Sequence, residues 1–158
     1  MKNKIEKWGF PLVLQERKIG FLFDSNRINN LKSEHSRKYY EDLHCRDGSA
    51  KFCLYDFESN KIVFTMDFHT SNKFSKEKFL KLNILYVNDP ELTNNGIATY
   101  YLKKLRDYAE EKEISKIKIE VDTEDPLFEN KENTLSKKDL IKFYKSIEND
   151  KLFVEIIE

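Results

Sequence analysis

Residues 79–112 read FLKLNILYVNDPELTNNGIATYYLKKLRDYAEEK, and this stretch decides the fold. Its first nine residues are apolar on both alternating faces, which is typical of a central strand: Phe79, Leu85 and Val87 against Leu80, Leu82, Ile84 and Tyr86. Asn88–Glu91 contains a proline, which cannot donate to a sheet ladder, so the strand ends there. From Gly96 to Lys112 the apolar residues recur at helical spacing, which predicts an amphipathic helix.

The start of this helix carries small residues that would let a ligand approach the backbone closely. A helix N-terminus has unpaired N–H groups and a partial positive charge, so it receives phosphate well. Gly96 and Ala98 leave room there, and Asn94 and Asn95 tolerate a tight backbone before it. An ordinary strand–turn–helix link with glycine at the cap explains the same residues. Taken alone, the segment leaves both interpretations open.

Upstream, two apolar segments joined by a short polar link predict an antiparallel hairpin. Its arms are Lys51–Phe57 and Ile62–Phe68. In the second arm one set of side chains alternates with another: Ile62, Phe64, Met66 and Phe68 against Val63, Thr65, Asp67 and His69. Such alternation is typical of a strand with one well-buried face. Nearer the N-terminus, Phe10–Leu14 and Ile19–Phe23 could each form a strand, and the spacing within Asn26–Leu43 predicts a helix.

Downstream, the pattern predicts a strand, a helix and a closing strand. Ile117, Ile119 and Val121 alternate with charged residues. Ser136 is a good N-cap for a helix whose apolar face contains Leu140, Phe143, Tyr144 and Ile147. Leu152–Ile157 closes the chain as a strand. The order predicts one domain over residues 1–158, in the α/β class, with a mixed, partly parallel sheet and helices on both faces.

The bulk composition narrows the possible partners. Hydrophobic residues make up 39% of the 158 residues, which is enough for one packed core. The 28 basic and 28 acidic side chains cancel, which argues against strong general attraction to nucleic acid or an anionic membrane. No apolar run approaches the roughly 18 residues needed to span a bilayer. We therefore expect a cytoplasmic protein with free thiols at Cys45 and Cys53 and no nucleic-acid or membrane partner.

Two segments together resemble the GNAT (Gcn5-related N-acetyltransferase) superfamily. Its core motif is a central strand, then Arg or Gln, two residues, Gly, one residue, and Gly or Ala opening a helix. Here the motif stands as Thr93-Asn94-Asn95-Gly96-Ile97-Ala98, with Thr93 in the place of the Arg or Gln. The pair Phe143-Tyr144 is similar to the aromatic-Tyr pair of the family's last conserved helix. The resemblance covers about residues 50 to 147.

The resemblance implies a GNAT-like fold, splayed at the cofactor site, that binds acetyl-CoA without a metal. The coenzyme arm would pair with the central strand at Leu85, Tyr86 and Val87. Its diphosphate would rest on the turn and helix start, formed by Thr93, Asn94, Asn95, Gly96, Ile97, Ala98 and Thr99. The acceptor would be a small-molecule or protein amine, and the protein a monomer or a homodimer.

The resemblance also implies direct attack of the amine on the thioester, with Tyr144 donating a proton to the leaving thiolate. A primary amine is largely protonated at neutral pH, so a base must take a proton from it. The candidates for this base are Asp67, His69, Glu120 and Asp122. Because Thr93 departs from the motif, the alternative is a catalytically inactive GNAT-like binding or regulatory module.

Overall fold

The computed structural model describes residues 1–26, 28, 39–121 and 136–157. The helices are α1 (Lys2–Lys7), α3 (Ile97–Glu111) and α5 (Lys137–Lys145), with short 3-10 helices η1 (Leu12–Leu14) and η2 (Pro90–Leu92). The strands are β1 (Ile19–Leu22), β2 (His44–Arg46), β3 (Ser49–Asp56), β4 (Lys61–Thr70), β5 (Leu80–Val87), β6 (Lys116–Glu120) and β7 (Phe153–Ile157).

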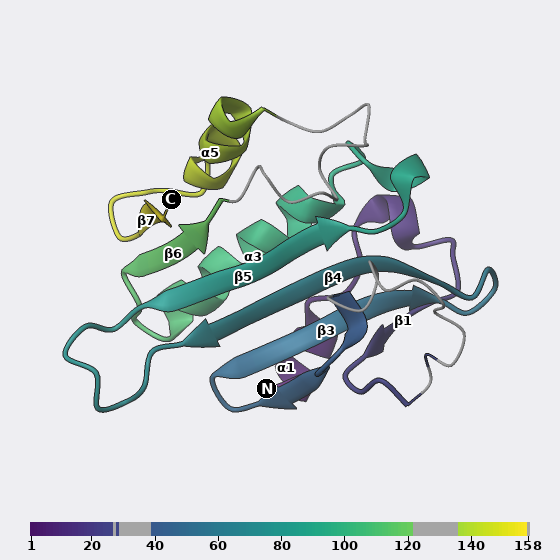
Figure 1. The fold of residues 1–158 in the computed structure, drawn as a ribbon, viewed down its shortest axis with the longest axis horizontal. Coiled ribbons are helices and arrows are strands. Elements are labelled where there is room, and N and C mark those ends of the chain that lie inside the picture. Colours follow the sequence, from purple (N-terminus) through teal and green to yellow (C-terminus); the bar gives the residue numbers. More distant parts are fainter. Residues whose placement is uncertain (27, 29–38, 122–135, 158) are drawn as a thin grey trace.

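The strands form one sheet in the order β1-β3-β4-β5-β6-β7, with β2 pairing with β3 (Figure 1). The pairs from β1 to β5 are antiparallel, whereas β5/β6 and β6/β7 are parallel. The predicted mixed, partly parallel sheet is therefore confirmed. Helix α3 connects β5 to β6, and α5 connects β6 to β7. Both connections are right-handed and step across the sheet in the same direction, so both helices lie on the same face.

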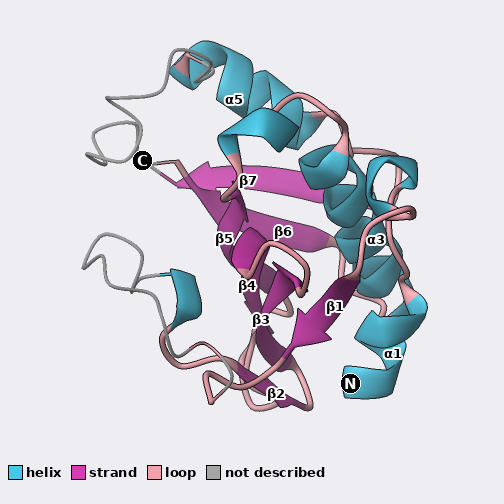
Figure 2. Ribbon diagram, turned by 90° about the vertical axis from the view of Figure 1, so that its right-hand side faces the viewer, coloured by secondary structure: helices cyan, strands magenta, loops and turns pink. Residues whose placement is uncertain are grey.

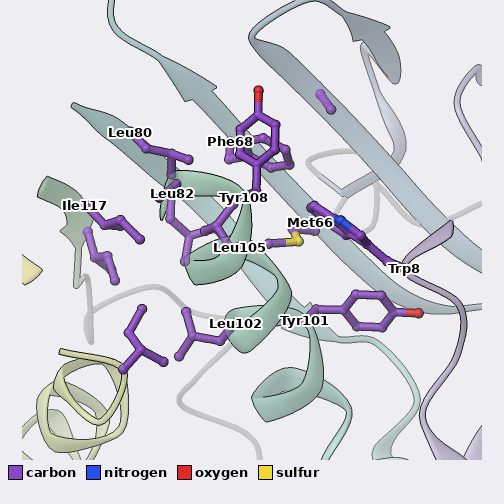
Figure 3. Packing of buried hydrophobic residues seen from close by; sticks show 14 of the residues in the cluster. Trp8, Met66, Phe68, Leu80, Leu82, Tyr101, Leu102, Leu105, Tyr108 and Ile117 are labelled. Carbon is purple, nitrogen blue, oxygen red and sulfur yellow. The ribbon is translucent and has the colours of Figure 1, made fainter. Parts of the chain in front are cut away.

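The main core lies between this face and the helices α1, α3 and α5. Trp8 stacks on Phe68 at 6.1 Å between ring centroids, and Tyr101 stacks on Phe64 at 4.8 Å. Figure 3 shows Trp8, Phe68 and Tyr101 packed together with the leucines of α3 against the strands. Figure 2 shows α1 and α3 on the same side of the sheet. Burial of these aromatic rings joins the N-terminal helix to the centre of the sheet.

The opposite face carries a smaller apolar cluster, made of Leu22, Ile28, Leu43, Cys53, Tyr55 and Ile62. Tyr39 and Tyr40 are helical, and the Tyr39 ring stacks on Tyr86 of β5 at 4.4 Å. Helical residues thus lie on both faces, as predicted. Most of the predicted helix Asn26–Leu43 falls outside the described residues.

Two of the predicted face assignments are wrong, because β4 and β5 each contain a bulge. In β4, Leu54 pairs with Phe64 but Tyr55 with Ile62, so Val63 is an extra residue. Ile62 therefore joins the smaller cluster, while Phe64 stays in the main core, against the prediction that both share a face. A bulge inserts one residue into a strand and so shifts the alternation beyond it by one.

The second bulge lies in β5. Phe68 pairs with Leu82 but Asp67 with Ile84, so Asn83 is the extra residue. Before the bulge, Leu80 and Leu82 face the main core; after it, Leu85 and Val87 do, and Tyr86 contacts Tyr39 instead. The predicted face that combined Leu82 with Tyr86 was wrong because alternation alone does not reveal an inserted residue.

The N-terminal part differs most from expectation. The predicted strand Phe10–Leu14 is wrong: Pro11 caps a 3-10 turn, closed by the Leu14 N–H donating to the Pro11 carbonyl at 2.9 Å. The second candidate strand, Ile19–Phe23, is confirmed as β1, which ends one residue earlier at Leu22. Helix α1 was not predicted, because six residues with one buried apolar side chain give no clear helical period. The free thiols at Cys45 and Cys53 are as expected.

Candidate functional site

The two central parallel strands separate partway along their length. β5 pairs with β6 only from Leu80↔Ile117 to Leu82↔Ile119. Beyond that point β5 continues to Val87 along β4, while β6 continues along β7 (Figure 1). Over positions 83–87, the described residues give the β6-facing side of β5 no ladder partner. The predicted splay of the sheet is therefore present, and it leaves strand-edge hydrogen-bonding groups open.

The separation begins at the bulge in β5. Leu82 is the last residue of β5 paired with β6, and the next residue is the inserted Asn83. A bulge bends its strand and increases the local twist, so it turns the rest of β5 away from β6. The predicted coenzyme residues Leu85, Tyr86 and Val87 lie on this separated part, each half-buried.

The turn after β5 leads into an open helix start. Asn94 and Gly96 both have positive φ, at 64° and 82°. Gly96 is the N-cap of α3, without a capping side chain, and a Cβ built on it would meet no atom within 4 Å. The first helical bond is donated by the Tyr100 N–H to the Gly96 carbonyl at 2.9 Å. The backbone N–H groups of residues 97–99 precede that bond, so they are available to an anion.

Side chains of the turn are used within the turn itself. The Asn95 amide donates to the Glu91 and Thr93 carbonyls, at 3.3 Å each, and the Thr93 hydroxyl donates to the Pro90 carbonyl. Asp89 accepts from the Glu91 N–H at 3.0 Å. These hydrogen bonds fix the conformation of the turn and occupy its polar side chains. The backbone groups of the turn are therefore the groups that remain available to a ligand.

The predicted residues at the helix start differ in exposure. Ile97 is buried in the main core, so only its N–H group could reach a ligand. Ala98 is half-buried, and Thr99 is exposed. The core therefore anchors one side of the helix start, while the other side stays open to solvent.

Tyr144 lies in α5, in the main core cluster shared with β6. It is 8% exposed, its ring lies 5.3 Å from that of Phe143, and no described residue accepts a hydrogen bond from its hydroxyl. Burial raises the pKa of this phenol to about 12. The hydroxyl thus stays protonated at neutral pH, as a proton donor must. The Asn149 amide donates to Glu110 at 2.7 Å and ties the segment after α5 to α3.

The candidate bases lie in different surroundings. Asp67 pairs with Ile84 of the separated strand, next to the bulge. Burial raises the pKa of its carboxyl group, although the Lys51 ammonium and a hydrogen bond from the Asn83 amide act in the opposite direction. The Glu120 side chain is 60% exposed and pairs with Lys81 at 3.6 Å. The structure thus brings Asp67 to the start of the gap and leaves Glu120 at the surface.

Sequence reasoning missed three polar residues around Asp67, namely Lys51, His44 and Asn83. Only Asn83 gave a signal, because asparagine is rare inside an apolar strand. Lys51 is 8% exposed, and nothing in its sequence neighbourhood indicates burial. His69 had been considered as a base and does lie in this group. The remaining candidate base, Asp122, falls outside the described residues.

The described residues contain neither a metal-ligand cluster nor a membrane-spanning helix. No three His, Cys, Asp or Glu side chains within residues 1–26, 28, 39–121 and 136–157 are grouped so that they could hold a metal ion. Over the same ranges, no helix has the length and apolar character needed to cross a membrane.

The solved structures that match part of this chain include acetyltransferases. The aminoglycoside acetyltransferase meta-AAC0020 from an uncultured soil metagenomic sample is 17% identical, with 86% of this chain and 90% of that chain covered and a TM-score of 0.47. The aminoglycoside acetyltransferase HMB0005, also from an uncultured soil metagenomic sample, is 16% identical, with 89% of this chain and 97% of that chain covered and a TM-score of 0.47. Glucosamine-6-phosphate N-acetyltransferase from Arabidopsis thaliana is 19% identical, with 58% of this chain and 67% of that chain covered and a TM-score of 0.41.

No family model matches the sequence. No curated protein is significantly similar to it.

Proposed function

We propose that this protein is an N-acetyltransferase that moves an acetyl group from acetyl-CoA to a primary amine. The observation that carries the proposal is the separation of β5 from β6 beyond the pair Leu82↔Ile119. It opens the edge of β5 along the same strand that leads into the uncapped start of α3. An extended, amide-bearing arm can pair with an open strand edge, and a diphosphate suits a helix start.

The residues present fit such a coenzyme. Positive φ at Gly96, with open space where a Cβ would stand, supports a close approach of phosphate to the backbone. Three successive N–H groups, at positions 97–99, are available there. The N-terminal end of the α3 dipole adds a favourable field for negative charge. Bound acetyl-CoA would supply an activated acetyl thioester to this site.

In the transfer, the N–C bond forms as the C–S bond breaks. The attacking amine must lose the proton that keeps it cationic, and Asp67, which pairs with Ile84 beside the gap, is the proposed base. A second amine proton must reach the departing thiolate, and Tyr144, kept protonated by burial, is the proposed donor to the sulfur. A strand-edge N–H of residues 83–87 would stabilise the developing oxyanion.

The competing function is a binding or regulatory module that keeps the coenzyme site without catalysis. Thr93 favours it, because the motif has Arg or Gln there and the Thr93 hydroxyl donates within the turn. Both functions predict coenzyme binding, and only the enzyme predicts release of free thiol in the presence of an amine.

Thermal unfolding with acetyl-CoA tests the proposal. At a hundred times the dissociation constant, a ligand adds about 2.7 kcal/mol of stability, or roughly 5–10 °C in Tm for a chain of this size. Acetyl-pantetheine, which lacks the diphosphate, is the matched ligand and should shift Tm less. A Tm unchanged by millimolar acetyl-CoA would refute coenzyme binding. A shift without thiol release over a panel of amines would favour the regulatory module.

A further inference from the structure

A polar patch crosses four strands on the face opposite α3. The register places His44, Lys51 and Asp67 in one row, on β2, β3 and β4. Ser49 and His69 form the next row, and Asn83 of β5 stands beside them. The smaller apolar cluster of this face lies further along the same strands. Because Asn83 follows Leu82, the last residue of β5 that pairs with β6, the patch lies at the point where β5 leaves β6.

Asn83 connects two members of the patch. Its amide Nδ2 lies 3.1 Å from Nδ1 of His69. An amide nitrogen can only donate, so His69 Nδ1 accepts, which assigns the ring proton of the neutral imidazole to Nε2. Asp67 pairs with Ile84, the residue that follows Asn83, and the Asn83 amide favours its charged form by lowering its pKa. The inserted residue at the start of the gap thus contacts His69 and lies beside Asp67.

His44 belongs to the patch but has no free nitrogen. Its Nδ1 lies 2.7 Å from the Asp42 carbonyl, which can only accept, so Nδ1 donates. Its Nε2 lies 2.8 Å from the Ser49 hydroxyl and, in the neutral ring, accepts from it. Both nitrogens are therefore occupied in holding the β2–β3 turn. This leaves Asp67 and His69 as the members of the patch that face Asn83.

The charges around Asp67 make it a suitable acceptor of a proton. Lys51 is buried beside it, and His44 and His69 also lower the cost of its negative charge. Burial acts against them and raises the carboxyl pKa. A carboxylate in this position takes a proton more readily than one in water, whereas Glu120 stands 60% exposed beside Lys81.

We propose that Asn83 is a positioning residue that holds His69 beside Asp67, the proton-accepting group of the acceptor site, for an alkyl amine that is protonated at neutral pH. This rests on the proposed acetyl transfer. Asp67 takes one proton from the ammonium group, which frees the nitrogen lone pair to attack. The half-buried Asp67 then returns that proton to solvent, while the second amine proton goes to the thiolate.

Reaction rates with two amines of matched size distinguish a catalytic base from a residue whose role is only structural. Ethylamine is protonated at neutral pH, whereas 2,2,2-trifluoroethylamine is mostly neutral there and needs no base before attack. General-base catalysis contributes about 10²–10⁴-fold. With ethylamine, Asp67→Asn should reduce thiol release from acetyl-CoA about 100-fold, and Asn83→Ala about 10-fold. With trifluoroethylamine both variants should stay within about 3-fold of the wild type. Equal losses with both amines would overturn the proposal.

Two further variants sharpen the assignment. Glu155→Gln removes an exposed carboxylate of β7 that pairs with Lys118 at 3.9 Å, and should change neither rate. Glu120→Gln should likewise spare the ethylamine reaction. A selective loss with ethylamine in Glu120→Gln, but not in Asp67→Asn, would move the base to Glu120 and overturn the proposal.

The ring nitrogen signals of the histidines, measured by NMR, test the geometry independently of activity. Asn83→Ala should move the Nδ1 signal of His69 and leave the His44 signals unchanged, because the amide contacts only the first ring. An unchanged His69 signal in this variant would overturn the positioning role. Absence of any acetyl-CoA-induced Tm shift, by contrast, would overturn the proposed function and leave this NMR result unaffected.

Discussion

Leu82 of β5 pairs with Ile119 of β6, and this is the last pair that the two parallel strands share. The next residue of β5, Asn83, has no partner of its own on β4. The end of the parallel ladder and the bulge therefore fall at the same point, which ties the open strand edge to a single inserted residue.

Deleting Asn83 should close the gap. Without it, Leu82 and Ile84 become neighbours opposite Phe68 and Asp67, so each side chain keeps its face while the bulge is lost. We expect a folded protein whose Tm no longer rises with acetyl-CoA. Circular dichroism would report the fold, and hydrogen exchange should show added protection along β5. An undiminished acetyl-CoA shift in the deletion variant would contradict the link between bulge and binding.

Gly96→Ala should weaken coenzyme binding more than its stability cost explains. A residue other than glycine at φ +82° costs about 1 kcal/mol. Gly9→Ala is the matched control, because Gly9 also has positive φ, +68°, and its nearest atom would be 3.6 Å from the new Cβ. Both variants should lose similar stability in denaturant unfolding. Calorimetry should show weaker acetyl-CoA binding for Gly96→Ala alone; equal affinities would remove the helix start from the site.

Tyr144→Phe should lower turnover at least 10-fold and leave acetyl-CoA affinity almost unchanged, because only a proton donor is lost. With its pKa raised to about 12, the Tyr144 hydroxyl remains a donor across the neutral and mildly alkaline range. Tyr101→Phe serves as the comparison, since that buried hydroxyl donates to the Gly9 carbonyl at 2.8 Å. It should lose about 1 kcal/mol of stability and keep its turnover. Full activity in Tyr144→Phe would exclude it as the donor.

Asp56→Asn should reduce stability at neutral pH but not in acid. Burial opposes ionisation of Asp56, yet its pKa is lowered, because its carboxylate accepts from the Glu58 N–H at 2.9 Å and the Ser59 N–H at 3.2 Å, with Arg17 nearby. The charged form therefore stabilises the fold above the unfolded pKa near 3.9, and the gain is lost as pH falls through the lower folded pKa.

We expect a wild-type advantage of about 1 kcal/mol at pH 7, since hydrogen bonds to charged groups are the stronger ones. Urea unfolding at pH 7 and at pH 2.5 measures it. A difference that stays constant between the two pH values would show that the Asp56 charge does not contribute.

The sequence determined the elements whose pattern is local. The stretch from Phe79 to Lys112 predicted a central strand, a turn and a helix, and β5 and α3 confirm it. The Ser136 cap was also correct, since its hydroxyl accepts from the Asp139 N–H at 3.2 Å. Hydrophobic period, proline and capping side chains act over a few residues, so they can be recognised without the rest of the chain.

The candidate site was only partly predictable. Gly96 and the helix start were recognised because small residues at a cap have a local conformational cause. The grouping of Asp67 with Asn83 was not, because these residues meet only through the β4–β5 register. Lys51 joins them from a third strand, so its burial depends on the same pairing.

What only the tertiary structure decided is where β5 leaves β6. The alternation in residues 79–87 is compatible with an unbroken strand, and the sequence alone does not show that Asn83 is inserted. Register is set by how two strands fit against a common core, and Leu82 and Leu85 both reach that core only if one residue between them is displaced. The same displacement separates the strands, so the open edge proposed to bind a coenzyme is a consequence of packing, whereas the helix start beside it follows from Gly96 itself.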